Sequence, residues 1–356
     1  MSRRATVVMT VGVVAVLVAS LLVHRLVAAD SGVGPSATDH FFDDYVSAAG
    51  QVIRHDQGGD TVSEGQAYAM RLAVDAADRP RFDAVWTWTK THLQRPDGLF
   101  AWRWKNGAIV DNDPAADADF DIADALRVAA TAFGDFAYAA EAKRIGAAVL
   151  ESETIDAGGE FVLVAGPWAV EDRVVNPSYL APCEYARFAT LTGDQRWNRL
   201  SDGSFDVLRA LISRGLPPDW VVLADTGTPR AIATPDDRMG AGRYGLDASR
   251  VPARLISCPS GRKLAAQMAP QLAQLADDGA GLAYSLDGKP LDKGTHPLGL
   301  IAAALTAETV GDDERASSLM NEASRLERKH STYYGAAWLA LADNLLDEFE
   351  ESPVGT

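Results

Sequence analysis

The sequence predicts an all-α fold, and three observations support it. Apolar residues recur at helical spacing in about a dozen segments separated by short turns. Many of these segments are rich in alanine, which permits close helix packing. Strand-like stretches are few and short, at residues 99–105 and 161–165. So many helices in one domain favour helical hairpins arranged in a ring. A stacked solenoid is the alternative, although no fixed sequence period is visible.

The elements are justified by local patterns along the chain. Ser63 can cap a helix, with Gln66 three residues later closing a capping box. Phe120, Ile122 and Leu126 provide an apolar pattern for a helix that begins near Asp119. Taken in order, helices are expected over residues 40–54, 63–77, 80–93, 119–133, 136–152, 178–192, 195–213, 247–257, 261–276, 296–309, 312–328 and 332–347.

The N-terminus predicts export. An uncharged run from residue 5 to residue 23 follows Arg3 and Arg4, and its length suits a membrane-spanning helix. It is either an uncleaved anchor or a cleaved signal peptide ending in small residues before Asp30. We therefore expect an anchor or signal over 1–29, a linker over 30–39, a catalytic domain over 40–347 and a tail over 348–356. The protein should be extracytoplasmic, either membrane-anchored or secreted.

Composition and the absence of common motifs exclude several classes of function. The 356 residues include 33 Lys+Arg and 49 Asp+Glu, a formal charge of −16, which argues against a nucleic-acid-binding protein. Two cysteines, Cys183 and Cys258, exclude a four-thiolate zinc site, and their pairing is left open. Phosphate-loop, serine-elbow and zinc-protease motifs are absent. The chemistry is therefore expected from carboxylates and aromatic side chains.

Three features could supply that chemistry. Glu64 lies in the first turn of an expected helix, where acids are also favoured for dipole reasons alone. The stretch 111–124 carries six aspartates, among them Asp117 and Asp119 at a helix entry; a solvated charge run is the alternative. The run 98–104 alternates Phe100, Trp102 and Trp104 on one expected strand face. That face is either core or a platform for sugar rings.

These segments together resemble glycoside hydrolase family 8, the endoglucanase type. The motifs that carry the resemblance include Ser63-Glu64-Gly-Gln-Ala-Tyr, Asp117-Ala-Asp119-Phe-Asp-Ile and Asn176-Pro-Ser-Tyr179. Further similar blocks lie in order at 82–89, 98–102, 215–220, 244–252 and 331–334, so the likeness covers roughly 40–347. Ala116, Arg127 and Leu246 depart from the family pattern, and Leu246 puts the substrate in doubt more than the chemistry.

The resemblance implies an (α/α)6 barrel and inverting hydrolysis of β-1,4-linked glycans without metal or organic cofactor. It makes Glu64 the general acid and Asp247 the general base. Asp117 would bind sugar hydroxyls and raise the pKa of Glu64 by proximity. Arg250 would hold Asp247 ionised, although an ordinary surface ion pair is the alternative. Substrate binding is expected at Trp102, Asp119, Tyr179, Arg250 and Tyr334.

The expected partner is a polysaccharide, with no nucleic acid, a monomeric chain, and membrane contact only through an uncleaved N-terminal segment. Cellulose-like β-1,4-glucan is the first choice of substrate. Xylan, mixed-linkage glucan and chitosan stay open within the resemblance. A non-catalytic glycan-binding protein on the same fold is the alternative from another class.

Overall fold

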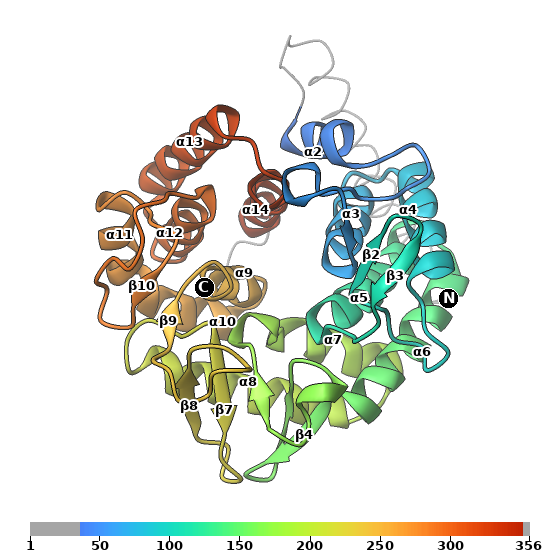
Figure 1. Cartoon of the computed structure of the whole chain (residues 1–356), viewed down its shortest axis with the longest axis horizontal. Coiled ribbons are helices and arrows are strands. Elements are labelled where there is room, and N and C mark those ends of the chain that lie inside the picture. The colour runs from blue at the N-terminus through green and yellow to red at the C-terminus, as the bar shows by residue number, and fades with distance from the viewer. Residues whose placement is uncertain (1–35, 352–356) are drawn as a thin grey trace, which may run out of the picture. The chain divides into compact units, whose positions relative to one another are not determined.

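The computed structural model describes residues 36–351 and shows a closed ring of paired helices (Figure 1). Six inner helices each contact the next around the ring, and the sixth returns to the first. They are α3 (Ser63–Asp75), α5 (Ala116–Ala132), α7 (Pro182–Thr192), α9 (Val251–Leu255), α12 (Pro297–Thr309) and α14 (Tyr333–Glu351). This arrangement is an (α/α)6 barrel, so the predicted ring of hairpins is confirmed and the solenoid is excluded.

Each inner helix is backed by outer helices. These are α2 (Ala37–Tyr45), α4 (Arg79–His92), α6 (Phe136–Ser152), α8 (Arg196–Ile212), α10 (Pro259–Ala265) with α11 (Ala269–Asp277), and α13 (Asp313–Lys329). Burial follows the two roles. In α12 nearly every residue is buried, whereas α13 buries mainly one face through Ala316, Leu319 and Ala323. Helices that are apolar all round belong inside, and amphipathic ones outside.

Several expected helix boundaries are wrong for local reasons. The expected helix 40–54 ends at Tyr45, where the chain turns back through a bridge between Val46 and Val52. The expected helix 261–276 is divided into α10 and α11, and Pro270 stands at the start of α11. Proline is favoured at the first turn of a helix and breaks one elsewhere. Helix α2 begins inside the expected linker 30–39, and α14 continues past 347.

Short antiparallel strands lie between the helices. The three-stranded sheets are β1 (Thr61–Val62), β2 (Arg103–Lys105) and β3 (Ala108–Asp111), and β6 (Val174–Val175), β7 (Trp220–Leu223) and β8 (Pro229–Ile232). The two-stranded sheets are β4 (Thr154–Ala157) with β5 (Glu160–Leu163), and β9 (Arg243–Tyr244) with β10 (Tyr284–Ser285). Strands β1, β6 and β9 come just before Glu64, Asn176 and Asp247, so they fix the chain where those residues emerge.

No helix within residues 36–351 is long and apolar enough to cross a membrane. The expected anchor or signal over 1–29 lies outside the described residues, as does most of the linker.

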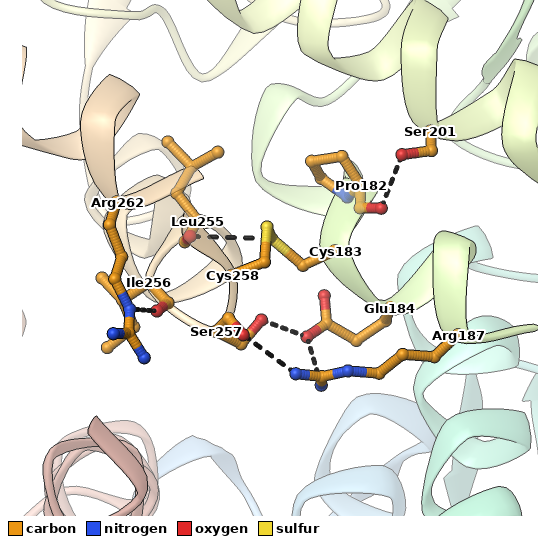
Figure 2. The surroundings of a disulfide bond; sticks show 10 residues. All are labelled: Pro182, Cys183, Glu184, Arg187, Ser201, Leu255, Ile256, Ser257, Cys258 and Arg262. Atoms are coloured by element: carbon orange, nitrogen blue, oxygen red, sulfur yellow. Dashed lines mark hydrogen bonds and ion pairs between the residues drawn. A yellow bond between two sulfur atoms is a disulfide. The ribbon is translucent and has the colours of Figure 1, made fainter. Parts of the chain in front are cut away.

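A disulfide joins Cys183, at the start of α7, to Cys258, directly before α10 (Figure 2). The sequence had left this pairing open. Polar contacts reinforce the junction: Ser257 Oγ donates to Glu184, and Arg187 donates to both Glu184 and the Ser257 carbonyl. The bond therefore fixes the segment after α9, which follows Arg250, against the neighbouring inner helix.

We expect Cys183→Ser/Cys258→Ser to lower the free energy of unfolding by about 2–5 kcal/mol, because the bond closes a long loop in the unfolded chain. The two cysteines are separated by 75 residues. Urea unfolding of the oxidised wild type and the double variant measures the difference. Two midpoints that coincide would show that the bond does not stabilise the fold.

Candidate active site

Three carboxylates converge on Arg250: Glu64 and Asp117 lie in the inner helices α3 and α5, and Asp247 lies in the segment before α9. One terminal nitrogen of Arg250 donates to Glu64 Oε1 at 2.6 Å and to Asp117 Oδ2 at 3.1 Å. The other donates to Asp247 Oδ1 at 3.2 Å. The Arg250 side chain is only 1% exposed. A charge buried this deeply is costly unless paired, so the three carboxylates compensate the buried guanidinium.

Glu64 occupies the first turn of α3, but its helix start differs from the expected one. The helix begins at Ser63 itself, and no side chain caps it. The expected capping box is therefore wrong. Gln66 is fully buried and instead bonds the Val52 N–H, the Gly50 carbonyl and Thr89. These bonds tie α3 to the preceding loop and to α4, and they make the helix start rigid.

The Glu64 carboxyl is oriented by two donors and partly open to solvent. Tyr68, one turn along the helix, donates its hydroxyl to Glu64 Oε1 at 2.9 Å, next to the Arg250 bond. The side chain is 23% exposed. With Oε1 held by both donors, Oε2 is the oxygen left to carry a proton.

Burial is the main electrostatic influence on this group. Burial raises the pKa of Glu64. The positive charge of Arg250 and the hydrogen bond from Tyr68 lower this pKa, and the negative charge of Asp247 raises it further. Burial raises the pKa of Asp117 to about 7, against the effect of Arg250 and with help from Glu64. Asp117 had been expected to be the cause of the Glu64 shift. Desolvation is the largest cause, and both carboxyls favour the protonated state more than exposed ones do.

Asp247 is the most accessible of the three carboxylates. It directly precedes the turn Ala248–Arg250, which leads into α9, so Asp247 and Arg250 lie on the same turn. Its side chain is 34% exposed, and Asn176 donates to its Oδ2 at 3.0 Å. The Arg250 pair is thus part of a buried network, and the surface ion-pair alternative is wrong.

A groove with a volume of about 340 Å³ opens beside Asp247. Its walls combine polar and apolar side chains: Asp219, Arg243, Leu246, Asp247, Leu282, Ala283 and Asp292. A groove of this kind, ending at a carboxylate, can hold a sugar ring.

Two of the predicted tyrosines flank the cluster. The Arg250 guanidinium lies 5.4 Å from the ring centre of Tyr179, which packs edge-on against Trp220. Tyr334 is half-buried and packs near His296 and Trp338. Negative charges at Glu64, Asp117 and Asp247 contribute to raising the pKa of Tyr334, after burial. Both rings are therefore within electrostatic reach of the same three carboxylates.

The aromatic run 98–104 does not share one face. Phe100 is fully buried in the core, and Trp104 packs edge-on against Trp88. Trp102 and Trp104 are both half-buried, and the Trp102 carbonyl accepts the N–H of Ser63, so the backbone of Trp102 lies beside the helix start that carries Glu64. The pairing register shifts between Arg103 and Trp104. The extra residue of this bulge lies in β3, and alternation fails for another reason: β2 begins only at Arg103, whereas Phe100 forms an isolated bridge with Gln94 and Trp102 lies in a bend.

Asp119 is fully buried, and the expectation that it contacts substrate is wrong. Its Oδ1 accepts the N–H of Phe100 at 2.7 Å, so it holds the aromatic run from behind. Glu153 is also fully buried and interacts with it. Burial raises the pKa of both carboxyls well above their ordinary values, and the negative charge of Asp119 raises that of Glu153 further.

Sequence reasoning assigned no role to four residues of this region. Tyr68 and Asn176 bond the carboxylates directly, and Asp219 accepts the N–H groups of Gly245 and Ala248 around Asp247. The fourth is Trp168, whose ring is 43% exposed and whose indole N–H donates to the Pro114 carbonyl. Tyr68 could have been found from its spacing, four residues after Glu64.

We expect Trp102→Ala to weaken binding of a soluble glucan oligosaccharide about 5- to 10-fold, since a stacking platform contributes about 1–1.4 kcal/mol. The melting temperature should change little, because the ring is half-exposed. Titration calorimetry and thermal unfolding measure the two effects. Phe100→Ala, in the core, is the matched control and should show the reverse pattern. A large loss of stability at Trp102 with unchanged affinity would make this ring part of the core.

A cluster of carboxylates around a buried arginine, on the inner ring of an (α/α)6 barrel, defines the class of helical-barrel proteins with a carboxylate active site. The sequence model of Glycosyl hydrolases family 8 matches residues 9–338, and the chain belongs to this family.

Individual relatives agree with this assignment. The chain is 34% identical over 221 residues to a probable endoglucanase of Novacetimonas hansenii, covering 58% of this chain and 62% of the relative. It is 34% identical over 198 residues to endoglucanase A of Acetivibrio thermocellus, covering 52% and 40%. The matched segments thus span about two fifths to three fifths of these relatives. The solved endo-β-1,4-glucanase CMCax of Acetobacter xylinum superposes with a TM-score of 0.73 at 26% identity, covering 88% of this chain and 98% of that one.

Proposed function

We propose that the protein is an endo-acting glycosidase that cleaves β-1,4-glucan with inversion of configuration. One observation carries the proposal: Glu64 and Asp247 bond opposite terminal nitrogens of a single guanidinium. The two carboxyls are thereby held by separate nitrogens of the same side chain. Inversion, which membership of this family supports, requires two carboxyls roughly 6.5–9.5 Å apart so that a water fits between them, against roughly 5–5.5 Å in retaining enzymes.

The reaction follows from the two environments. Protonated Glu64 donates its proton to the glycosidic oxygen, and that oxygen takes the electron pair of the breaking bond. Asp247 removes a proton from a water as the water oxygen bonds the anomeric carbon from the opposite side. Product release then lets Glu64 regain a proton and Asp247 lose one to solvent. Arg250 holds both carboxylates in place throughout.

Relatives named endoglucanase or endo-β-1,4-glucanase support cellulose-like glucan as the substrate. Xylan, mixed-linkage glucan and chitosan are the other β-1,4-linked polymers that the test includes. A non-catalytic glycan-binding role is disfavoured because Glu64, Asp117 and Asp247 converge on one guanidinium, which binding alone does not require.

Export is part of the proposal. The apolar run at residues 5–23 suits an anchor or a signal peptide, and a disulfide between Cys183 and Cys258 suits an oxidising compartment. We propose an extracytoplasmic enzyme, membrane-anchored or secreted, that acts as a monomer.

Reducing-sugar release from a panel of soluble polymers tests the activity. Carboxymethyl-cellulose, lichenan, xylan and chitosan are each incubated with wild type and with Glu64→Gln/Asp247→Asn as the blank. We expect the fastest release from the β-1,4-glucan, with a rapid fall in viscosity that marks internal cleavage. Binding to these polymers without any release above the blank would support the glycan-binding alternative.

We expect kcat/KM to decline on the alkaline side of the pH profile. The acid form requires a proton on Glu64, and burial raises the pKa of Glu64 above its ordinary value. As pH rises through this raised pKa the proton is lost, so kcat/KM should decline on the alkaline side of the range in which an exposed carboxyl titrates. Burial also raises the pKa of Asp117 to about 7, so Asp117→Asn should remove the part of the decline near that pH that comes from this second carboxyl. A rate that stays constant well into the alkaline range would contradict this picture.

A further inference from the structure

The side-chain amide of Asn176 has only one possible orientation. Asn176 is fully buried, and its Oδ1 accepts the backbone N–H of Ser178 at 3.0 Å and the Ser178 hydroxyl at 2.7 Å. A backbone N–H can only donate, so the oxygen must face Ser178. The NH2 group is therefore forced to face Asp247, where it donates to Oδ2 at 3.0 Å.

The Asp247 carboxylate is thus held from both sides. Arg250 donates to Oδ1 and Asn176 to Oδ2, from segments far apart in the chain. Each carboxylate oxygen has a second lone-pair direction, and the side chain is 34% exposed, so a water can still reach it. The two hydrogen bonds from Arg250 and Asn176 therefore leave the carboxylate able to act as a base.

The backbone around Asp247 is fixed independently. Buried Asp219 accepts the N–H of Gly245 at 2.9 Å and that of Ala248 at 3.0 Å. A side chain at position 245 would strike Asp219, because an added Cβ would lie 2.4 Å from Oδ2. With the main chain held on both sides, the remaining freedom of Asp247 is rotation of its side chain. Asn176 and Arg250 are the groups that restrain this rotation.

We propose that Asn176 is a positioning residue for the general base, which it orients without touching the substrate. This inference rests on the proposed function, in which Asp247 activates the water. Nothing in the covalent chemistry passes through Asn176. Its effect is exerted through the direction in which the free lone pairs of Asp247 point and through the charge state of that carboxylate.

Other charged groups near Asp247 must be held constant in any test of pH dependence. Those that face it or share its groove are Arg250, Glu64, Asp219, Arg243, Asp292, Tyr179 and Tyr334. Asn176 itself is uncharged, so replacing it by alanine removes one hydrogen-bond donor and leaves this set of charges unchanged.

The test uses Asn176→Ala on the soluble glucan that the wild type cleaves best. We expect kcat to fall roughly 10- to 100-fold with KM nearly unchanged, because a misdirected base loses rate and not substrate affinity. The acid limb of the pH profile should move upward by roughly one pH unit, because the ionised base has lost a donor. Asn321→Ala, on the exposed outer helix α13, is the control and should behave like wild type.

Asn176→Asp keeps the shape of the side chain and provides a second readout. Its inner oxygen can still accept from Ser178, while its outer oxygen places a like charge against Asp247. The acid limb should therefore move further upward than in Asn176→Ala. This variant also carries the test if the alanine variant does not fold.

Two results would overturn the proposal. One is a kcat within about threefold of wild type with an unmoved acid limb in both variants. The other is a loss of activity that follows a loss of melting temperature, with the limb unmoved. If the wild type cleaves no glycan, the proposed function fails first. In that case the effect of Asn176 on Asp247 is measured without activity. Carbon-13 NMR follows the titration of the Asp247 carboxyl in Glu64→Gln and in Glu64→Gln/Asn176→Ala, and the second protein must titrate at the higher pH.

Discussion

Glu64→Gln is expected to lower kcat on soluble glucan by roughly 10²–10⁴-fold, the usual contribution of general acid catalysis. The glutamine amide oxygen can still accept from Tyr68 and Arg250, so the fold and glycan binding should persist. What the amide lacks is a proton to give to the leaving oxygen. Steady-state kinetics and calorimetric binding of an oligosaccharide measure the two properties separately.

A substrate with a better leaving group provides a second test of Glu64 as the general acid. An aryl glycoside with an acidic phenol needs little protonation, so Glu64→Gln should be far less impaired on it than on glucan. Glu314→Gln is the matched control, because Glu314 also lies in the first turn of a helix but on the exposed α13. A loss under threefold on glucan would remove Glu64 from the role of acid.

Asp247→Asn should be equally damaging for a different reason. An amide cannot take a proton from water, so hydrolysis should fall to near the level of the double variant while substrate remains bound. Added azide needs no base, and it should restore bond cleavage by forming a glycosyl azide of inverted configuration. Kinetics with and without azide, and chromatography of the product, measure this.

Asp206→Asn, exposed on the outer helix α8, is the control for the charge change and should keep most activity. Near-normal turnover by Asp247→Asn, with only some loss of stability, would make Asp247 a partner of Arg250 alone. The search for the base would then return to Asp117, since Asp119 is sealed in the core.

Local patterns predicted the helices well where the chain is strongly periodic. The segment 136–152 was expected as a helix, and α6 has those bounds. Errors arose where tertiary contacts override local preference. Gln66 fits a capping box by spacing, yet the neighbouring loop and α4 recruit its side chain. The strand face expected for Phe100, Trp102 and Trp104 does not form, because β2 begins only at Arg103 and Phe100 instead forms an isolated bridge with Gln94.

The site was predicted through resemblance more than through spacing. Glu64 and Arg250 lie 186 residues apart, and no sequence period links them; only closure of the ring brings them together. Asp117 and Asp119 look equivalent in the sequence, but two positions along a helix face different directions. Asp117 turns to Arg250, and Asp119 turns to the backbone of Phe100. Which face of α5 points inward follows from packing against its neighbours.

The first-formed product provides the most direct test of the central claim, that Glu64 and Asp247 act on opposite faces of the sugar. Proton NMR is recorded in the first minutes of glucan hydrolysis, before the anomers equilibrate. Inversion of a β-linkage predicts that the α-anomer signal appears first and that the β-anomer grows later by mutarotation. A β-anomer that appears first would mean retention, and would contradict the mechanism proposed for this arrangement of carboxylates.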